Sequence, residues 1–368
     1  MRFDMVDTLV PNSRLKKSYF DRCCDLLPST SFPHDLLQCR YAAPRLPRYR
    51  HRVTLTLTVD SAAWNRRVDA MAARIEGFVP VVKGNGYGFG REWLAERAAL
   101  LAPMMAVGTV YEVDSVPSNF SALVLTPALA VPDGLRDNAI LTVGSPTHVE
   151  AAATGSGQRR VVVKVRSTMN RYGVDADTVD ESISLCRHKG LVVAGVSIHP
   201  PLHGSNADHR REIESLIGSI HRDLPIYVSH LDESEYEILR ATHPDRTWNL
   251  RVGTSLWHGD KKELSLSADV LDVHTIETDS IAGYRGRPVR RGDRLVIIGC
   301  GSAHGVAPLD GGMSPFHYAR QRLALLEAPH MHTSMCIIPE EQACPTIGEA
   351  VDVQRPLTTT HVDIVHWT

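Results

Sequence analysis

Short apolar runs recur between residues 53 and 257, and helical stretches such as 178–188 and 208–221 separate most of them. The runs are rich in β-branched residues and are bounded by turn-forming residues, which is typical of buried strands. Repeated alternation of strand and helix favours parallel strands, and at this count it favours an α/β fold with a (β/α)8 TIM-type barrel. The predicted barrel strands are 79–82, 105–107, 122–126, 140–143, 161–165, 192–198, 226–228 and 250–252.

The pattern of predicted strands and helices changes on either side of this region. Residues 54–59 alternate cleanly and predict a strand, and Asp60 predicts the N-cap of a helix that runs to about residue 75. After Trp257, short strands are predicted between glycine, proline and aspartate residues, at 270–276, 294–298, 335–338, 350–353 and 361–365. We therefore expect a barrel domain over 52–262 and a C-terminal all-β domain over 263–368. Residues 1–51, with one short helix near 19–27, predict an extension that is poorly ordered or packed on the surface.

Composition excludes several classes of protein. A net charge of −2 gives no argument for binding nucleic acid or an anionic membrane. No apolar run approaches the length of a membrane span, and the first residues lack a signal-peptide core. The seven cysteines are an odd number without zinc-type spacing, so we expect free thiols in a reducing cytoplasm and no metal site.

One stretch carries a strong chemical signal, the sequence VVKGNGYGFG at residues 81–90. It reads as a buried strand that ends in a lysine, Lys83, and then enters a tight glycine-rich loop. A desolvated lysine has a lowered pKa, and its neutral amine can form a Schiff base with a carbonyl. The glycines allow the backbone to approach a bulky ligand closely. The alternative from these residues alone is a strand-end lysine that extends into water.

The stretch resembles the motif VVKANAYGHG of alanine racemases, whose lysine binds pyridoxal 5'-phosphate. By this resemblance Lys83 is the cofactor-binding lysine and a catalytic base, and Tyr87 is a cofactor contact. The sequence departs from the motif at Gly84, Gly86 and Phe89. The family layout is a barrel followed by a β-domain, so the resemblance extends over about residues 52–368.

The segment from Lys164 to Gly173 is similar to the family pattern K-x-D-T-G-M-x-R-x-G, with Arg166 and Thr168 as departures. The resemblance implies that Arg171 contacts both the phenolic oxygen of the cofactor and the substrate. It also implies that Lys164 is the lysine that orients this arginine and is often carbamylated.

Two further segments match at the ends of predicted strands. His199 aligns with the family histidine that lies against the pyridine ring. Arg251 aligns with the arginine that faces the pyridine nitrogen, and Gly253 and Thr254 align with residues that offer N–H groups to the phosphate. A cation beside that nitrogen keeps it unprotonated, which suits proton removal and return. Ser229 is a further, loosely aligned candidate for the phosphate.

The β-domain departs more from the family. The family supplies its second base, a tyrosine, from this domain across a homodimer interface, and Cys300 occupies the tyrosine position. Cys300 is therefore predicted as the second catalytic base, with His304 as the other candidate and a merely buried cysteine as the alternative. Met331 matches the methionine whose N–H meets the substrate carboxylate. His361 falls where a phosphate-contacting tyrosine is expected.

Three functions remain open from the sequence. The first is a pyridoxal-phosphate-dependent isomerase that racemises or epimerises an amino acid, with Lys83 serving one face of Cα and Cys300 the other. The second is an amino-acid decarboxylase of the same fold. Such decarboxylases also place a cysteine over the cofactor, usually in a G-P-x-C setting, but the G-P is absent before Cys300 and Arg251 argues against this function. The third is a cofactor-binding protein without turnover.

Overall fold

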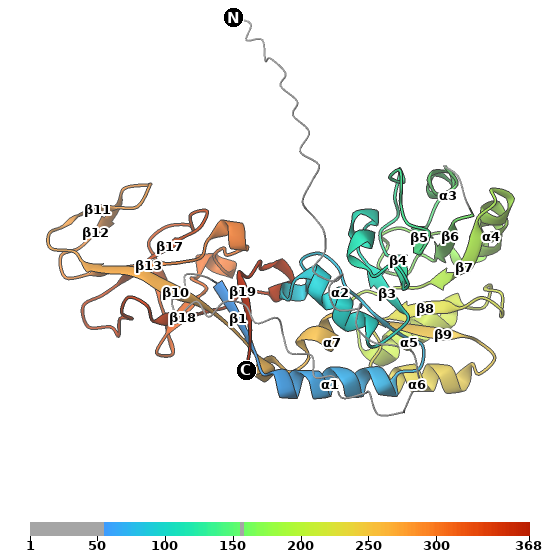
Figure 1. The fold of residues 1–368 in the computed structure, drawn as a ribbon, viewed down its shortest axis with the longest axis horizontal. Coiled ribbons are helices and arrows are strands. Elements are labelled where there is room, and N and C mark those ends of the chain that lie inside the picture. Colours follow the sequence, from blue (N-terminus) through green and yellow to red (C-terminus); the bar gives the residue numbers. More distant parts are fainter. Residues whose placement is uncertain (1–54, 155–157) are drawn as a thin grey trace, which may run out of the picture. The chain divides into compact units, whose positions relative to one another are not determined.

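The computed structural model describes residues 55–154 and 158–368. The predicted extension, with its short helix near residues 19–27, lies outside the described residues. The described chain contains an eight-stranded parallel sheet and a nine-stranded sheet, with a separate two-stranded hairpin (Figure 1).

The eight parallel strands form a nearly closed barrel, which confirms the predicted fold class. Their order in the sheet is β2-β9-β8-β7-β6-β5-β4-β3, and a bridge between Val81 and Ala106 joins the two ends of this series. Their bounds are β2 Phe78–Pro80, β3 Met104–Val107, β4 Ser121–Val124, β5 Ala139–Val143, β6 Arg160–Lys164, β7 Val192–Ser197, β8 Ile226–Ser229 and β9 Trp248–Val252.

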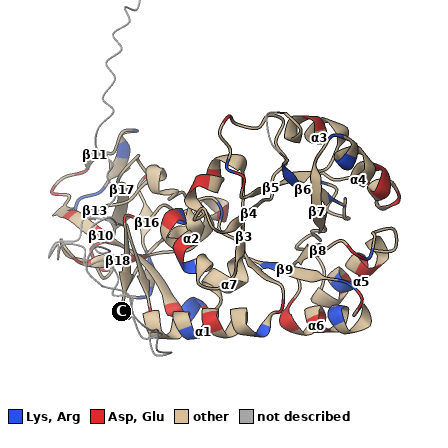
Figure 2. Ribbon diagram, turned by 45° about the vertical axis from the view of Figure 1, so that its right-hand side comes forward, with Lys and Arg blue, Asp and Glu red and all other residues tan. Residues whose placement is uncertain are grey.

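Helices lie outside the ring of strands (Figure 2). The Asp60 side chain accepts a hydrogen bond of 2.9 Å from the N–H of Ala63 and so caps the first helix, as the sequence predicts. The connection from β3 to β4 contains the 3-10 helix η2 (Val110–Ser115) in place of an α-helix. The α-helices are α1 Ser61–Arg74, α2 Arg91–Ala99, α3 Pro146–Ala152, α4 Val179–His188, α5 Asn206–Leu216, α6 Glu233–Thr242 and α7 Thr254–His258.

The C-terminal region is built on a sheet of mainly antiparallel strands. The long strand β10 pairs with β1, β13 and β18, and β13 pairs in turn with β17. The strands of this region are β1 Leu55–Val59, β10 Leu264–Thr275, β11 Ser280–Ala282, β12 Arg287–Val289, β13 Arg294–Ile298, β14 Phe316–Tyr318, β15 Gln321–Arg322, β16 Ala324–Leu325, β17 Ser334–Ile338, β18 Ala350–Val353 and β19 Ile364–Trp367.

The strand β1 shows a limit of the sequence prediction. We expected it within the barrel segment 52–262, but it pairs with β10 and β19 in the C-terminal sheet. Its alternating pattern predicts a strand and a buried face without specifying the partner strand, because either sheet could bury the side chains of Leu55, Leu57 and Val59.

Among the helices of the described residues, none has both the length and the apolar composition of a membrane span.

Candidate active site at the barrel mouth

Lys83 lies just beyond β2, at the carboxyl end of the barrel strands, where the loops of this fold build active sites. The two preceding residues fix its position, because the N–H of Val81 donates to the carbonyl of Val252 at 2.8 Å. The N–H of Val82 donates to the carbonyl of Ala106 at 2.7 Å. The chain thus reaches Lys83 while bonded to β9 on one side and β3 on the other.

The loop after Lys83 is a tight left-handed turn. Gly84, Gly86 and Tyr87 all have positive φ angles, and the N–H of Gly86 donates back to the carbonyl of Lys83 at 3.1 Å. A Cβ atom at position 86 would lie 2.5 Å from the backbone nitrogen of Arg91. Glycine is therefore required at position 86, where the chain passes close to the start of α2.

Glu112 supports this loop from the neighbouring strand end, and the sequence analysis missed it. One carboxylate oxygen accepts the N–H of Gly84 at 3.2 Å, and the other accepts the N–H of Gly108 at 2.7 Å. The available signal was its position five residues after the strand β3, at the end of the barrel where such residues bind or react.

The surroundings of Lys83 lower the pKa of its amine. The Lys83 side chain keeps exposed surface, but partial desolvation of its amine is still the largest cause of the lowered pKa, and the nearby guanidinium groups of Arg171 and Arg251 act in the same direction. The carboxylate of Glu112 opposes them. A lowered pKa favours the neutral amine, which is the nucleophilic and basic form.

Tyr87 and Gly253 lie against each other, although they are far apart in the sequence. A Cβ atom at position 253 would overlap the hydroxyl of Tyr87, so the missing side chain leaves room for that hydroxyl. Thr254 follows as the first residue of α7, and N–H groups in the first turn of a helix lack acceptors within the helix. Burial raises the pKa of Tyr87, so its hydroxyl stays protonated and able to donate.

Arg251 extends from β9 into the interior of the barrel and is buried. Its Nη2 donates to the carbonyl of Ile198 at 2.7 Å, and its Nε lies 3.4 Å from the carbonyl of Val228. Burial lowers its pKa to about 10, so the side chain is still a cation at neutral pH. The described residues place no carboxylate in an ion pair with it, and backbone carbonyls take the place of an acid.

His199 completes the interior of the site as a neutral imidazole. Its Nδ1 lies 2.5 Å from the hydroxyl of Ser229, and its ring centroid lies 4.4 Å from that of His230. Burial, with Arg251 as the next cause, lowers the pKa of His199 to about 2. His230, which the sequence analysis did not single out, has a positive φ of 61° and bonds through Nδ1 to the carbonyl of Pro200 at 2.9 Å.

Lys164 and Arg171 lie on the same side of the site. Lys164 is buried at the end of β6, and its Nζ lies 3.4 Å from the carbonyl of Ser197. Burial lowers its pKa well below the usual value. Arg171 is exposed, with its guanidinium carbon 4.5 Å from the ring centroid of Tyr172. No hydrogen bond joins Lys164 to Arg171 in the described part of the chain.

Comparison with known proteins identifies the family to which this chain belongs. The sequence model of the alanine racemase N-terminal domain matches residues 59–260, which is more than half of the chain. The chain belongs to the alanine racemase family. A search of curated protein sequences found no match.

Solved alanine racemases share the fold at low sequence identity. The enzyme from Bartonella henselae, crystallised with covalently bound pyridoxal phosphate, is 18% identical, with a TM-score of 0.62 over 83% of this chain and 91% of that one. The enzyme from Bacillus anthracis with bound L-Ala-P is 19% identical, with a TM-score of 0.63 over 84% and 86% of the two chains. The enzyme from Streptomyces coelicolor A3(2) is 16% identical, with a TM-score of 0.61 over 86% and 98%.

In this family member Cys300 is buried with 0% of its surface exposed, and it belongs to the hydrophobic core. Burial also raises the pKa of its thiol, with Cys336 and Asp363 as further causes. A side chain without exposed surface cannot contact a substrate bound to another subunit. The structure therefore argues against the predicted role of Cys300 as a base and favours the alternative of a small buried cysteine.

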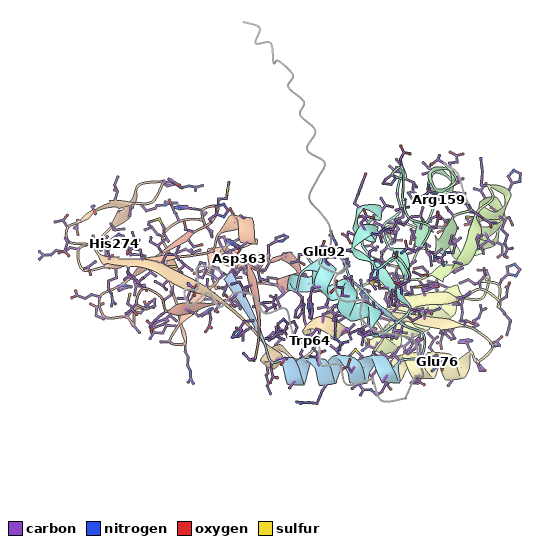
Figure 3. The ribbon with its side chains drawn as sticks, viewed as in Figure 1. Trp64, Glu76, Glu92, Arg159, His274 and Asp363 are labelled. Carbon is purple, nitrogen blue, oxygen red and sulfur yellow. The ribbon has the colours of Figure 1, made fainter. Side chains whose placement is uncertain are left out.

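His304 is also committed to internal bonds. Its Nδ1 accepts the N–H of Gly301 at 3.1 Å, which leaves the proton on Nε2. Nε2 lies 3.1 Å from the carboxylate of Asp363 (labelled in Figure 3). Both ring nitrogens of His304 are occupied, so neither is available as a base.

The remaining predicted residues lie at exposed positions. His361 lines a pocket together with Gly84 and Asn85, which places it beside the loop that follows Lys83. The amide of Asn85 donates to the carbonyl of Thr360 at 2.6 Å and so holds the two segments together. Met331 is 67% exposed on the β-domain.

Proposed function

We propose that the protein is a pyridoxal-phosphate-dependent amino-acid racemase or epimerase that acts in the cytoplasm. The observation that carries the proposal is the buried, positively charged Arg251, which lies near Lys83 and His199. The family match supports the cofactor class, and the identity of the reaction rests on this arrangement.

The residues at the barrel mouth fit this cofactor. The absent Cβ of Gly253 lets the hydroxyl of Tyr87 lie close to the backbone at the start of α7, where a hydroxyl donor and backbone N–H groups together suit a phosphate. Lys83 has the lowered pKa of an amine suited to a carbonyl ligand. Tyr87, Gly253, Thr254 and His361 would hold the phosphate, and Arg171, His199 and Arg251 would hold the ring.

When bound, pyridoxal phosphate draws electrons from Cα of an amino acid and so makes the Cα proton removable. Lys83 then accepts or returns that proton at its Nζ on one face of Cα. Arg251 would place a positive charge beside the pyridine nitrogen of the cofactor. Stronger withdrawal of electrons into the ring would need a carboxylate at that position. This difference favours proton exchange over decarboxylation.

We also propose that two chains form a homodimer in which the β-domain of each completes the active site of the other. Lys83 would serve only one face of Cα, so the opposite face needs a group from elsewhere, and Met331 is exposed on the β-domain, where its N–H would meet a substrate carboxylate. A stable monomer with full activity in sedimentation experiments would refute this arrangement.

The test uses purified protein with added pyridoxal phosphate. Hydride reduction followed by peptide mapping should place the cofactor on Lys83. Incubation with L- and D-amino acids should then give the opposite enantiomers without release of CO₂. Release of CO₂ would instead identify a decarboxylase, and a bound cofactor without either product would identify a binding protein.

A further inference from the structure

We propose that His332 exchanges the proton on the face of Cα opposite Lys83. This inference rests on the proposed function and on sharing of the active site between subunits. It answers a question that the structure raises, because Cys300 is buried and both nitrogens of His304 are engaged. His332 is exposed and lies in the same corner of the β-domain.

The loop that carries His332 is held firmly by its neighbours. The N–H of Ser302 donates to the carbonyl of His330 at 2.8 Å, and the N–H of Ala303 donates to the carbonyl of Met331 at 2.9 Å. Glycine is required at position 301, because a Cβ atom there would overlap the carbonyl of His330. The chain just after Cys300 thus serves as the support for the loop that presents His332.

A buried carboxylate fixes the other side of this loop. Glu327 lies 2.5 Å from Nε2 of His330, and it also accepts the backbone N–H groups of Tyr284 and Arg285 at 2.8 and 3.0 Å. The N–H of His330 donates to the carbonyl of Thr333 at 2.9 Å, which closes the turn around Met331 and His332. A side chain on such a loop is positioned before a ligand arrives, which is a requirement for a catalytic group.

The immediate surroundings of His332 suit a substrate. Among the described residues no acceptor takes the N–H of Met331, so this donor is free for a carboxylate. The ring of His332 meets the ring of His304 edge-on, with centroids 6.1 Å apart and planes at 82°. His304 in turn contacts Asp363, so the exposed imidazole of His332 lies against a buried histidine that is itself bonded to a carboxylate.

The chemistry of the step balances with one proton on each face. In one direction the neutral imidazole of His332 takes the Cα proton and becomes an imidazolium, while protonated Lys83 returns a proton to the other face. In the opposite direction Lys83 accepts the proton and the imidazolium of His332 donates. No electrons are gained or lost, and imidazole is suited to this role because it exchanges protons near neutral pH.

Tyr284 is the competing residue in this corner. It is 87% exposed, and its ring centroid lies 4.3 Å from that of His330. A phenol ordinarily ionises about three pH units above an imidazole, so at neutral pH very little of it is in the deprotonated form that can accept a proton. The experiment therefore includes Tyr284→Phe beside His332→Gln.

The test compares variants of the full-length protein loaded with pyridoxal phosphate, with L- and D-alanine and then a panel of other amino acids as substrates. His332→Gln should keep the cofactor on Lys83 but racemise roughly a hundredfold more slowly or worse. Exchange of Cα hydrogen with solvent deuterium should persist for the one enantiomer whose proton faces Lys83. Added imidazole should restore part of the racemisation in His332→Ala, which a purely structural role would not produce.

His274→Gln is the matched control, because His274 is an exposed histidine on β10, far along the β-domain from Asp363 (Figure 3). It should racemise at the parental rate. Parental racemisation by His332→Gln, or a hundredfold loss confined to Tyr284→Phe or Cys300→Ala, would overturn this inference alone. A parent protein that carries the cofactor and exchanges no Cα hydrogen would overturn the proposed function and the inference together.

Discussion

The barrel mouth and the β-domain corner around residues 300–304 and 330–333 differ in how they position their polar side chains. At the mouth, Arg251 lies on a strand and Lys83 and His199 lie within three residues of strand ends, so the register of the sheet places them. In the corner, backbone hydrogen bonds between two loops decide which side chains are buried and which are exposed. Strand positions are therefore predictable from sequence spacing, and loop positions depend on contacts with distant residues.

Removal of Lys83 should have the largest effect and tests the barrel half of this comparison. Lys83→Ala should abolish the covalent attachment of pyridoxal phosphate and lower racemisation by roughly 10⁴-fold, because it removes the nucleophile and one base. Absorbance spectra, hydride labelling and chiral product analysis measure these losses. The control Lys189→Ala changes an exposed lysine just after α4 and should behave as the parent. Retained labelling in Lys83→Ala would move the cofactor site elsewhere.

The glycine loop offers a sharper test with two similar substitutions. Both Gly84 and Gly86 have positive φ, but a Cβ atom meets nothing within 4 Å at position 84 and meets the nitrogen of Arg91 at position 86. Gly84→Ala should cost about 1 kcal/mol of unfolding free energy through backbone strain alone. Gly86→Ala should cost roughly 2 kcal/mol more, because backbone must move. Equal losses in urea denaturation would show that the loop can move away from α2 at little cost.

Acid should destabilise the barrel mouth through His199. Its folded pKa of about 2 lies below the ordinary value, so the unfolded chain binds a proton that the folded chain does not. The free energy of unfolding should therefore fall as pH drops below about 6.5, with His199 contributing about 1 kcal/mol per pH unit. His199→Asn should reduce this slope in urea titrations, whereas His366→Asn, at an exposed position on β19, should not. An unchanged slope in His199→Asn would mean that the buried imidazole is not kept neutral.

The smallest effect on catalysis is expected in the β-domain corner. Cys300→Ser should racemise within about twofold of the parent, because its side chain does not reach a substrate, while a hydroxyl in this apolar site should cost about 1–2 kcal/mol of stability. Chiral assays at matched cofactor occupancy, together with thermal unfolding, separate the two effects. A hundredfold loss of racemisation in a folded, cofactor-loaded Cys300→Ser would return Cys300 to the active site.

The sequence by itself determined the barrel, because apolar runs typical of buried strands recur eight times and helical stretches separate most of them. It also determined the cap at Asp60 and the residues that reach the barrel mouth, such as Lys83 and Arg251, since a strand end fixes where its side chains lie. Local patterns sufficed at these places because the controlling interactions lie within one strand, one helix or one turn.

Only the tertiary structure decided the features that depend on distant partners. The strand β1 could pair with either sheet, and its partner was settled by β10 and β19, more than 200 residues away. Cys300 has the sequence position of a base, yet it lies in the core formed with Cys336 and other distant residues. Glu112 and His332 gave little local signal, because one acquires its contacts from the loop after Lys83 and the other its exposure from the chain after Cys300. Burial and long-range hydrogen bonds are properties of the whole chain, and no local window of the sequence contains them.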